Sequence, residues 1–591
     1  MRIGGFEVTA RRFQPWPARR TVGWLSAILL LSAALGIRGL DWGLPYQWHP
    51  DEKVMVADTM IRERTLEPPH FINPSLHAYA TYAAVRLAYA LEPRMGIRYR
   101  TEGNVGLTDP GSPDRALQFM AFRLSRLLSV LFQLVTVYLL YRIGRYYADA
   151  ATGLIAAWFG AVTMGLVNMA HFATGESMLF MLCLWALWRF SRVTDRGSWG
   201  DYALAGLATG LACSTKYTPW ILAVPFLVAH VSGRGLRAAF SARGIAAMAL
   251  TFASTVGGFL ATSPYVVLSW PMFREAMIVT WLTGAPGGSL AGLERSWIPY
   301  VGILGNALGW PLFALSLAGC SVAIVRILNR QTSASLRAGL LIHLSWIVSF
   351  YAFYGITSHR ALRFIMPIGP SLVLLAAMAP TWLLRSTTQA APARRRSARA
   401  LALGAIVVVG VYSTIYAVRA VHMFAADTRY AAGRWIQNQA LPTGMPVEYF
   451  TIESYLPYFD RPAFPLRQLT AVLDNGLRGG DYWNDLMPRL RNPSGGLIVD
   501  SDAFYPRFLN LGVQARFPER AHTYKMLFAG EGSPYRLVAR IVSHGPSWLD
   551  PRPELVCPEM VIFATPNIVP DDRIMQPMPP GREDVIELFP R

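Results

Sequence analysis

The stretch TVGWLSAILLLSAALGIRGL, residues 21–40, contains no charged side chain before Arg38. As a helix, about 20 residues span roughly 30 Å, which is the thickness of a bilayer's hydrocarbon core. Arginines precede the stretch, as in a signal peptide, but no small-residue cleavage site follows it and further apolar runs do. The stretch therefore predicts a retained first membrane helix.

The same pattern recurs along most of the chain. Of the 591 residues, 53% are hydrophobic and 15% are charged, whereas a soluble protein is about one quarter charged. We predict eleven spans, at residues 21–40, 121–143, 150–169, 175–191, 201–215, 219–232, 244–263, 300–325, 338–356, 362–384 and 400–420. The fold class expected is a polytopic all-α membrane domain, residues 1–420, followed by a small extracytoplasmic α/β domain, residues 421–591.

The charge distribution indicates how the chain is oriented. Residues 421–591 hold 17 Lys and Arg against 19 Asp and Glu, so the net charge of +19 comes from the membrane part. Its arginines lie in short loops, which is typical of cytoplasmic loops and argues against nucleic-acid binding. The tract Arg394–Arg396 with Arg399 is the clearest such marker. We expect a plasma (inner) membrane protein with a cytoplasmic amino terminus and an external carboxy-terminal domain.

The segments predicted to lie outside have their own patterns. Residues 51–64 and 74–91 are typical of helices at the membrane surface, and the glycine-rich segment 286–292 is a candidate lid. In the tail we predict a helix at 427–440 and strands at 447–452, 496–499, 535–542 and 560–564. The four cysteines are scattered and form neither a disulfide framework nor a thiolate metal site.

The segment Trp48-His49-Pro50-Asp51-Glu52-Lys53 directly follows the first span. Adjacent carboxylates at a membrane surface are unusual, and one of them could accept the proton of an attacking hydroxyl as a general base. The alternative is structural, because Asp51 can cap the next helix and Glu52 can complement its dipole. Both interpretations can hold together.

A second acidic turn lies between the third and fourth spans, at His171-Phe172-Ala173-Thr174-Gly175-Glu176. Glu176 opens an apolar helix, where an acid is stabilised by the helix dipole. If this turn folds toward Asp51, Glu176 and His171 would join it around one site that orients sugar hydroxyls or a divalent cation. Asp51 and Glu176 are then the metal ligands, if there is a metal.

Two further outer turns carry cations. Lys216, one of only three lysines, stands beside Tyr217 in Ser214-Thr215-Lys216-Tyr217-Thr218, and Arg360 and Arg363 precede the tenth span. They could bind a lipid phosphate and compensate its charge as a glycosidic bond breaks. Equally, such residues can be interfacial anchors for the helix ends.

Together these motifs resemble the GT-C superfamily, in particular the branch with protein O-mannosyltransferases and the aminoarabinose transferase of lipid A. The likeness rests on the Asp51-Glu52 pair, on Asn73-Pro74-Ser75-Leu76, on residues 171–181, on the glycine-rich run 206–217 ending in Thr-Lys-Tyr, on 360–370 and on 427–436. Where the family usually has aspartate, this chain has Glu176. Where the family has tyrosine after arginine, it has Phe364.

The resemblance implies a transferase that moves a sugar from a polyprenyl-phosphate donor to an external acceptor with inversion. Asp51 is then the base, Glu52 and Glu176 support it, and Lys216, Arg360 and Arg363 hold the donor phosphate. His49, His171 and Tyr217 are expected to contact substrate. The acceptor, a lipid, a polysaccharide or a protein, and the sugar stay open, as does a divalent metal cofactor.

Two other classes of function are compatible with this sequence. A lipid-linked sugar flippase would also have many spans, but transporters carry polar or broken helices at the midplane, whereas these acids lie at loop edges. A noncatalytic glycolipid-binding scaffold is the third possibility.

Overall fold

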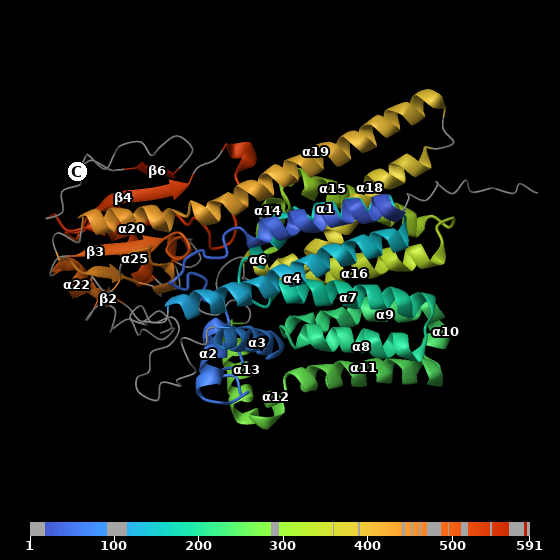
Figure 1. Ribbon diagram of the computed structural model, residues 1–591, viewed down its shortest axis with the longest axis horizontal. Helices are drawn as coiled ribbons and strands as arrows, with labels where there is room; N and C mark the ends of the chain where they lie inside the picture. Colours follow the sequence, from blue (N-terminus) through green and yellow to red (C-terminus); the bar gives the residue numbers. More distant parts are fainter. Residues whose placement is uncertain are drawn as a thin grey trace, which may run out of the picture.

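The computed structural model describes residues 18–91, 115–284, 295–357, 360–387, 391–439, 444–450, 453–459, 461, 464–469, 486–493, 496–509, 514, 518–543, 546–566 and 584–587. The predicted lid at 286–292 and residue 359 lie outside these ranges. Figure 1 shows two parts along the long axis, a helix bundle and a smaller region containing a sheet.

The helix bundle is built from apolar segments that become helical because a bilayer offers their backbone no other partners. Its helices are α1 (Ala18–Ile37), α4 (Arg115–Tyr147), α5 (Ala150–Ala161), α6 (Met164–Ala170), α7 (Glu176–Asp195), α8 (Trp199–Cys213), α9 (Ala223–Arg234), α11 (Ala242–Thr262), α14 (Trp297–Leu308), α15 (Trp310–Leu328), α16 (Ala334–Ile356), α18 (Gly369–Ser386) and α19 (Pro392–Ala425). Short helices connect them: η2 (Thr218–Leu222), α10 (Leu236–Ala239), α12 (Tyr265–Leu268), α17 (Leu362–Ile365) and η4 (Met366–Ile368). At the centre is α18, in which every residue from Gly369 to Trp382 is buried.

The number of spans is smaller than predicted when length and apolarity are both required. Seven helices of the described residues meet that test, or eight if the bent pair α5 and α6 counts as one span. The predicted spans 201–215 and 219–232 correspond to α8, with 15 residues, and α9, with 12. α8 packs against α7 and α11, whereas α9 packs against α7 and α16 and is buried only at Pro225, Ala229 and His230. The predicted span 175–191, which corresponds to α7, does not meet the test either. A multi-pass membrane protein is confirmed, and eleven spans are not.

Two predicted spans are interrupted in the structure. The predicted span 300–325 is divided at Gly309, whose φ of +78° ends α14 before α15 begins. The predicted span 150–169 is the bent pair α5 and α6, with an angle of 59°. Apolar composition alone cannot reveal such breaks, because both halves remain hydrophobic.

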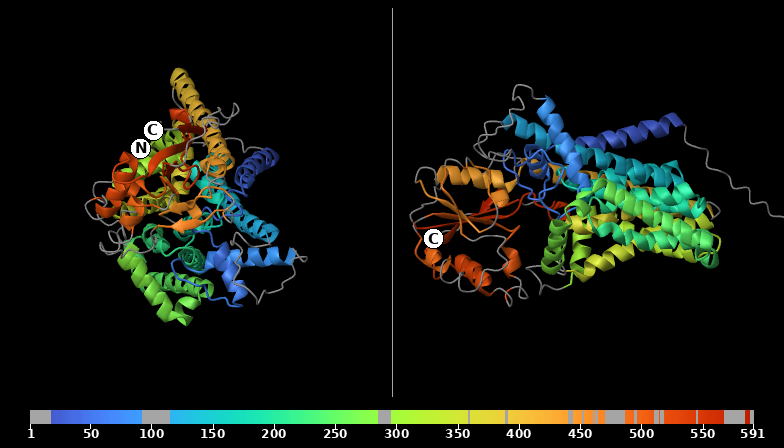
Figure 2. Two further views of the ribbon diagram at one scale, coloured as in Figure 1. Left: turned by 90° about the vertical axis from the view of Figure 1, so that its left-hand side faces the viewer. Right: turned by 90° about the horizontal axis from the view of Figure 1, so that it is seen from below.

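The two predicted surface helices are present. They are α2 (Val54–Arg62) and α3 (Leu76–Leu91), and with α13 (Trp270–Gly284) they lie at the end of the bundle that carries the sheet region, to one side of the sheet (Figure 1). Figure 2 shows α2 and α3 from two further sides. This layer forms the boundary at which the candidate site is built.

The carboxy-terminal region contains a six-stranded mixed sheet in the order β2-β1-β3-β5-β4-β6. Its strands are β1 (Val447–Tyr449), β2 (Leu466–Gln468), β3 (Leu497–Ser501), β4 (Arg536–Ser543), β5 (Met560–Ala564) and β6 (Asp584–Glu587), of which β2 and β6 were not predicted. β1 pairs in parallel with β2 and β3, and the remaining pairs are antiparallel. A mixed α/β region is therefore confirmed.

Helices cover both faces of this sheet. Leu497 and Val499 of β3 pack with Trp435 of α20 (Thr428–Gln439), whereas Ile498 between them packs with Leu527 of α25 (Pro518–Ala529). Because successive strand side chains point to opposite faces, both faces must be apolar when both are covered. Smaller helices complete the region: η6 (Glu453–Tyr455), α22 (Met487–Arg491), α23 (Pro506–Leu509) and η9 (Ser547–Leu549).

The predicted division between residues 420 and 421 falls inside α19, which continues to Ala425. The domain boundary at that position stays a prediction.

Candidate active site

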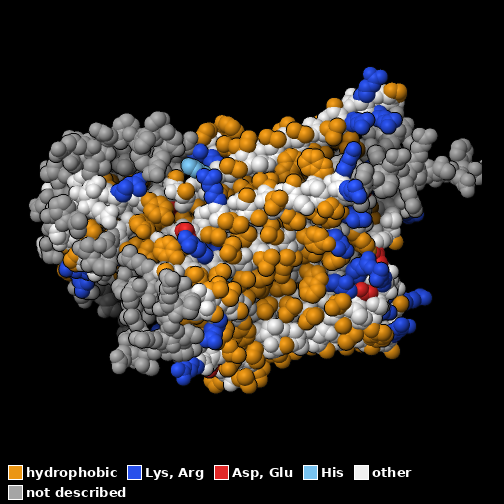
Figure 3. Space-filling model, in the orientation of Figure 1, with side chains coloured by type: hydrophobic (Ala, Val, Ile, Leu, Met, Phe, Trp, Pro, Cys, Tyr) orange, Lys and Arg blue, Asp and Glu red, His pale blue; other side chains and the backbone are white. Residues whose placement is uncertain are grey.

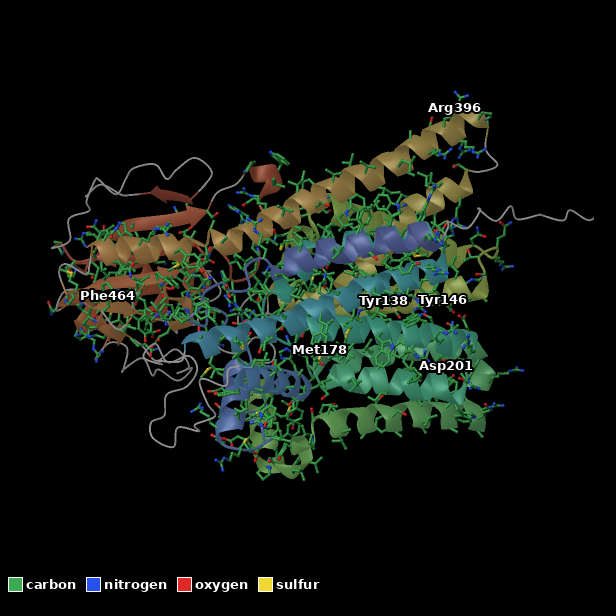
Figure 4. The ribbon with its side chains drawn as sticks, in the orientation of Figure 1. Tyr138, Tyr146, Met178, Asp201, Arg396 and Phe464 are labelled. Carbon is green, nitrogen blue, oxygen red and sulfur yellow. The ribbon has the colours of Figure 1, made fainter. Side chains whose placement is uncertain are left out.

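Two turns that are far apart in the sequence are joined by hydrogen bonds. The amide of Ala173 donates to Oε1 of Glu52 at 2.9 Å, and the amide of Lys53 donates to the carbonyl of Ala173 at 3.0 Å. The first acidic segment is thus attached to the turn that leads into Glu176. This end of α7 faces the sheet region, as Met178 shows in Figure 4.

Asp51 is the accessible carboxylate of this site, with 46% of its side chain exposed. Its Oδ2 lies 3.2 Å from Nη2 of Arg363, and its amide donates to Nδ1 of His49 at 3.1 Å. Burial raises the pKa of Asp51, but the neighbouring positive charges, above all that of Arg363, outweigh it, so the pKa lies below its ordinary value. Asp51 is therefore a carboxylate at neutral pH, and its amide is held by a neighbouring ring.

His49 is fully buried against Phe172, with the ring centroids 4.4 Å apart. Burial lowers the pKa of His49, so the imidazole is neutral. Since Nδ1 accepts the Asp51 amide, the proton is on Nε2, which has no hydrogen-bond partner among the described residues. The structure places His49 beside the predicted base.

Glu52 differs sharply from Asp51, because its side chain is completely buried. Its oxygens receive two hydrogen bonds from Arg126 of α4, at 2.8 and 3.0 Å, and Arg126 also donates to the carbonyls of Leu40 and Trp42. All of these bonds fasten the outer loop to α4. The geometry favours a positioning role for Glu52. Its partner Arg126 was not predicted from the sequence.

Glu176 and Lys216 meet directly. Nζ of Lys216 lies 2.5 Å from Oε1 of Glu176, and only 4% of the Glu176 side chain is exposed. Lys216 also lies over the ring of Phe364, at 5.5 Å from its centroid. The predicted second acid and the predicted phosphate ligand are thus brought together as an ion pair.

Arg363 connects the bundle to the carboxy-terminal region. Besides contacting Asp51, its Nη1 pairs with Glu554, and its amide donates to Oε2 of Glu554 at 2.9 Å. The amide of Glu554 in turn donates to Oδ1 of Asn168 in α6 at 2.9 Å. Glu554, 191 residues after Arg363, is a second residue that sequence reasoning missed, and no local pattern singles it out.

The remaining predicted site residues are Arg360, Tyr217 and His171, and their contacts differ. Arg360 is half-buried, three residues before Arg363. Tyr217 donates to the carbonyl of Phe71 at 3.0 Å and so holds the segment before α3. His171 is buried, its two nitrogens contact the carbonyls of Val167 and Arg38, and its ring stacks on Phe424. This geometry favours a structural role for His171.

Two further residues belong to the cluster. Burial lowers the pKa of Lys53, the carboxylates of Asp51 and Glu176 raise it and the charge of Lys216 lowers it, so Lys53 lies among these charged groups. No ion pair within 4.0 Å joins Lys53 to a carboxylate in the described part of the chain. His77 of α3 is 3% exposed and both its nitrogens lack a described partner. Burial lowers the pKa of His77 to about 4, so it is neutral. A Cβ placed on Gly175 would lie 3.6 Å from the Cβ of His77, which puts His77 against the turn before Glu176.

For Lys53, though not for His77, the sequence contains an indication of a role. Lysine is so rare in this chain that Lys53 could have been singled out as Lys216 was. For a metal, the described residues contain no group of three or more His, Cys, Asp or Glu side chains arranged to hold an ion. Asp51 and Glu176 are instead each paired with a cation.

Solved structures share this architecture. ArnT from Cupriavidus metallidurans bound to undecaprenyl phosphate superimposes with a TM-score of 0.51 at 14% identity, over 95% of this chain and 100% of that chain. An oligosaccharyltransferase from Archaeoglobus fulgidus, in the apo form, gives a TM-score of 0.50 at 11% identity, over 88% of this chain and 73% of that chain. The oligosaccharyltransferase AglB from the same archaeon, in complex with an inhibitory peptide and a dolichol-phosphate, gives a TM-score of 0.50 at 12% identity, over 95% of this chain and 75% of that chain.

The chain therefore shares its fold with ArnT and with the archaeal oligosaccharyltransferases. Residues 121–262, from α4 to the end of α11, match the family model described as dolichyl-phosphate-mannose-protein mannosyltransferase. This match and the shared fold confirm the resemblance drawn from the sequence motifs. No curated protein sequence matches the chain.

Proposed function

We propose that this protein transfers a sugar from a polyprenyl-phosphate donor to an acceptor on the outer side of the membrane, with Asp51 as general base and with inversion at the anomeric carbon. The observation that carries the proposal is the difference in exposure between the acids: Asp51 is 46% exposed, whereas Glu52 and Glu176 are buried in ion pairs. Only an accessible carboxylate can accept a proton from an arriving acceptor hydroxyl.

The proposed reaction is a single displacement. The acceptor oxygen attacks the anomeric carbon as its proton moves to Asp51, and the bond between that carbon and the phosphate oxygen breaks. Polyprenyl phosphate leaves with the electron pair. Arg363 keeps Asp51 deprotonated, and Glu52 with Arg126 holds the loop on which Asp51 stands. No step in this scheme requires a metal ion.

The leaving phosphate needs positive charge on the opposite side of the sugar. Lys53, Lys216 and Arg360 are the candidates, and Lys53 is the strongest because it has no described ion-pair partner. The pair of Lys216 with Glu176 makes the site less positive than its lysines alone suggest. Glu176 therefore serves in this proposal to orient Lys216. His49 serves in this proposal to hold the backbone of Asp51, whose amide donates to its Nδ1.

A lipid-linked donor suits this location. A nucleotide sugar is hydrophilic and cytosolic, whereas a polyprenyl tail keeps the donor in the bilayer beside the site. Arg396, at the end of the bundle away from the sheet in Figure 4, supports a cytoplasmic position for that end and an external one for residues 421–591. The names of the similar structures, one with undecaprenyl phosphate and one with dolichol-phosphate, support a donor of this chemistry.

The test compares cells lacking this protein with cells that express the wild type or Asp51→Asn at equal membrane levels. Mass spectrometry of lipids should reveal one polyprenyl-phosphate sugar that accumulates without the protein, which identifies the sugar. Wild type should remove it and Asp51→Asn should not, since loss of a general base lowers the rate by about 100- to 10,000-fold. Asp41→Asn is the matched control, because Asp41 lies in the same outer loop but pairs with Arg123 at the exposed surface.

Other outcomes would point to the competing functions. Movement of the labelled lipid across vesicles without a new glycosidic bond would indicate a flippase. Full complementation by Asp51→Asn would indicate a noncatalytic scaffold, and either result would overturn the proposal.

A further inference from the structure

A groove of about 950 Å³ lies at the end of the bundle opposite the candidate active site. It is formed by the start of α1, the last turns of α4 and the second half of α7, and we call it the arginine groove. Its lining residues are Thr21, Val22, Leu25, Tyr138, Tyr141, Arg142, Arg145, Tyr146, Trp188, Arg189 and Arg192. In α7, Trp188 follows Glu176 by 12 residues, which separates the two sites by about 18 Å along the helix.

The charge of the arginine groove is strongly one-sided. Four arginines line it, and the lining contains no carboxylate. Only Arg189 has an acidic partner, since its Nη2 lies 2.7 Å from Oδ1 of Asp201. Arg142, Arg145 and Arg192 form no ion pair with any carboxylate that the structure describes. Three uncompensated positive charges therefore surround one hollow.

Aromatic side chains hold these arginines in place. Arg142 lies over the rings of Tyr138 and Trp188, at 5.7 and 5.4 Å, and Arg192 lies over Tyr146 at 5.4 Å. Arg142 also donates to the hydroxyl of Tyr138 at 2.8 Å. A guanidinium that is already positioned loses less entropy when it binds an anion.

Two buried donors in the arginine groove lack partners. Nε1 of Trp188 and Nε of Arg189 are inaccessible to solvent and make no hydrogen bond with the described residues. Buried donors are normally satisfied.

The surroundings combine this charge with apolar surface. Figure 4 places Tyr138 and Tyr146 at the end of the bundle away from the sheet, with Asp201 nearby. Figure 3 shows Lys and Arg gathered at this end, next to the broad hydrophobic surface that covers the middle of the bundle. On α1, Val22 is 63% exposed, so one wall of the groove continues into lipid-facing surface.

We propose that the arginine groove binds the phosphate headgroup of an anionic phospholipid, with an acyl chain lying along Val22 and Leu25. Each arginine offers several N–H donors in a forked geometry, and this geometry matches the oxygens of a phosphate. The bound lipid ties α1 to α4 and α7. Ordinary interfacial arginines spread around a bundle, whereas these four converge on one hollow together with orphaned donors.

The test measures lipid retention by the full-length protein. Wild type, Arg142→Gln and Arg192→Gln are purified in mild detergent, delipidated, and incubated with equal amounts of phosphatidylglycerol and phosphatidylcholine. Native mass spectrometry then counts the lipids that remain bound. Wild type should retain phosphatidylglycerol at least about tenfold over phosphatidylcholine, since one charge-assisted contact is worth about 1.5–3 kcal/mol, and each variant should lose most of this preference.

Matched controls separate this groove from general surface charge. Arg394→Gln removes an arginine of the exposed start of α19, outside the groove, and should keep the preference. Arg142→Lys keeps the positive charge and should keep part of the preference for phosphatidylglycerol. Size-exclusion profiles establish that each variant is folded. Phosphatidylglycerol should raise the melting temperature of wild type and of Arg394→Gln, but not that of Arg142→Gln or Arg192→Gln.

Three results would overturn the proposal: equal retention of the two lipids by wild type, unchanged preference in both glutamine variants, or equal loss in Arg394→Gln. Displacement of the lipid by inorganic phosphate at equal concentration would also overturn it, because the groove would then recognise free phosphate. Stronger binding of a short-chain polyprenyl phosphate than of phosphatidylglycerol would assign the groove to the carrier lipid instead.

Discussion

At the scale of single residues, neighbouring acids in this protein have opposite environments. Asp51 and Glu52 are adjacent, yet one is 46% exposed beside Arg363 and the other is completely buried against Arg126. A carboxylate with water and substrate on one side can exchange a proton. A carboxylate whose oxygens are all occupied can only fix a structure. These two adjacent residues therefore suit different roles, proton transfer for Asp51 and structural support for Glu52.

Removal of Arg363 should change the pH dependence of transfer. Because Arg363 lowers the pKa of Asp51, the base stays charged until the pH falls through that lowered value. In Arg363→Gln only burial and weaker charges remain, so the pKa rises and activity is lost at a higher pH on the acid side. The measurement is kcat/KM for sugar transfer against pH, with Arg123→Gln as the control. An acid limb that does not move would show that Arg363 does not set the protonation of Asp51.

Neutralising one member of the Glu52–Arg126 pair should destabilise the fold. Glu52→Gln leaves the Arg126 guanidinium buried without a countercharge, which costs about 3–5 kcal/mol. The melting temperature of the detergent-purified protein should fall markedly. Asp41→Asn, in a pair that is 51% exposed on both sides, should change stability by less than about 1 kcal/mol. Normal stability of Glu52→Gln together with lost transfer would instead assign Glu52 to the chemistry.

At the scale of elements, close helix contact depends on glycine. Gly206 and Gly210 of α8 face α11, where a Cβ would lie 2.2 Å from the carbonyl oxygens of Thr251 and Thr255 respectively. The hydroxyl of Thr255 also donates to the carbonyl of Gly206 at 3.1 Å. Small residues at this spacing let two helix backbones approach inside a membrane. The glycine-rich run that resembled the family's motif thus has a packing reason.

Gly210→Ala should therefore destabilise the bundle. Overpacking of a closed contact costs about 1–3 kcal/mol, because the backbone of α11 cannot yield without moving the whole helix. Gly257→Ala, in α11 itself, is the matched control, since nothing lies within 4 Å of the added Cβ and alanine favours helix by about 1 kcal/mol. Thermal unfolding in the same detergent compares the two. Equal melting temperatures would mean that the α8–α11 contact is not closely packed.

At the scale of the whole molecule, the carboxy-terminal region is fastened to the end of the bundle that carries the candidate site by a buried junction. Asp427 accepts from Nε1 of Trp42 at 2.9 Å and from the amide of Cys557 at 2.9 Å. It also pairs with Arg429, whose guanidinium carbon lies 4.0 Å from the Trp48 ring centroid. The loop that carries Asp51 is thus supported by both parts of the molecule.

Asp427→Asn should loosen this junction without reaching the site directly. The buried Arg429 would lose its countercharge at a cost of about 3–5 kcal/mol. Hydrogen exchange should accelerate in residues 42–48 and in α20, and transfer should slow because Asp51 is less well positioned. Asp550→Asn, whose partner Arg552 is 82% exposed, should leave exchange at the junction unchanged. Unchanged exchange in Asp427→Asn would show that the junction does not depend on this ion pair.

Much of this architecture follows from the chain alone. Apolar runs predict the membrane part because lipid tolerates only helices with satisfied backbones. Alternating and continuous apolar runs predict the strands, and β5 has the predicted bounds, Met560–Ala564. The motifs around Asp51, Glu176 and Lys216 are local, so they too can be found without a structure.

The tertiary structure alone decided how these pieces combine. The spans are fewer than predicted because α8 and α9 are short helices and because α7 does not meet the test of length and apolarity. The difference between Asp51 and Glu52 depends on Arg126, 74 residues further on, and Glu554 reaches Arg363 across 191 residues. Such contacts depend on the docking of whole elements, so no local pattern encodes them. The physical reason is that a side chain's accessibility and charge environment are determined by what packs against it.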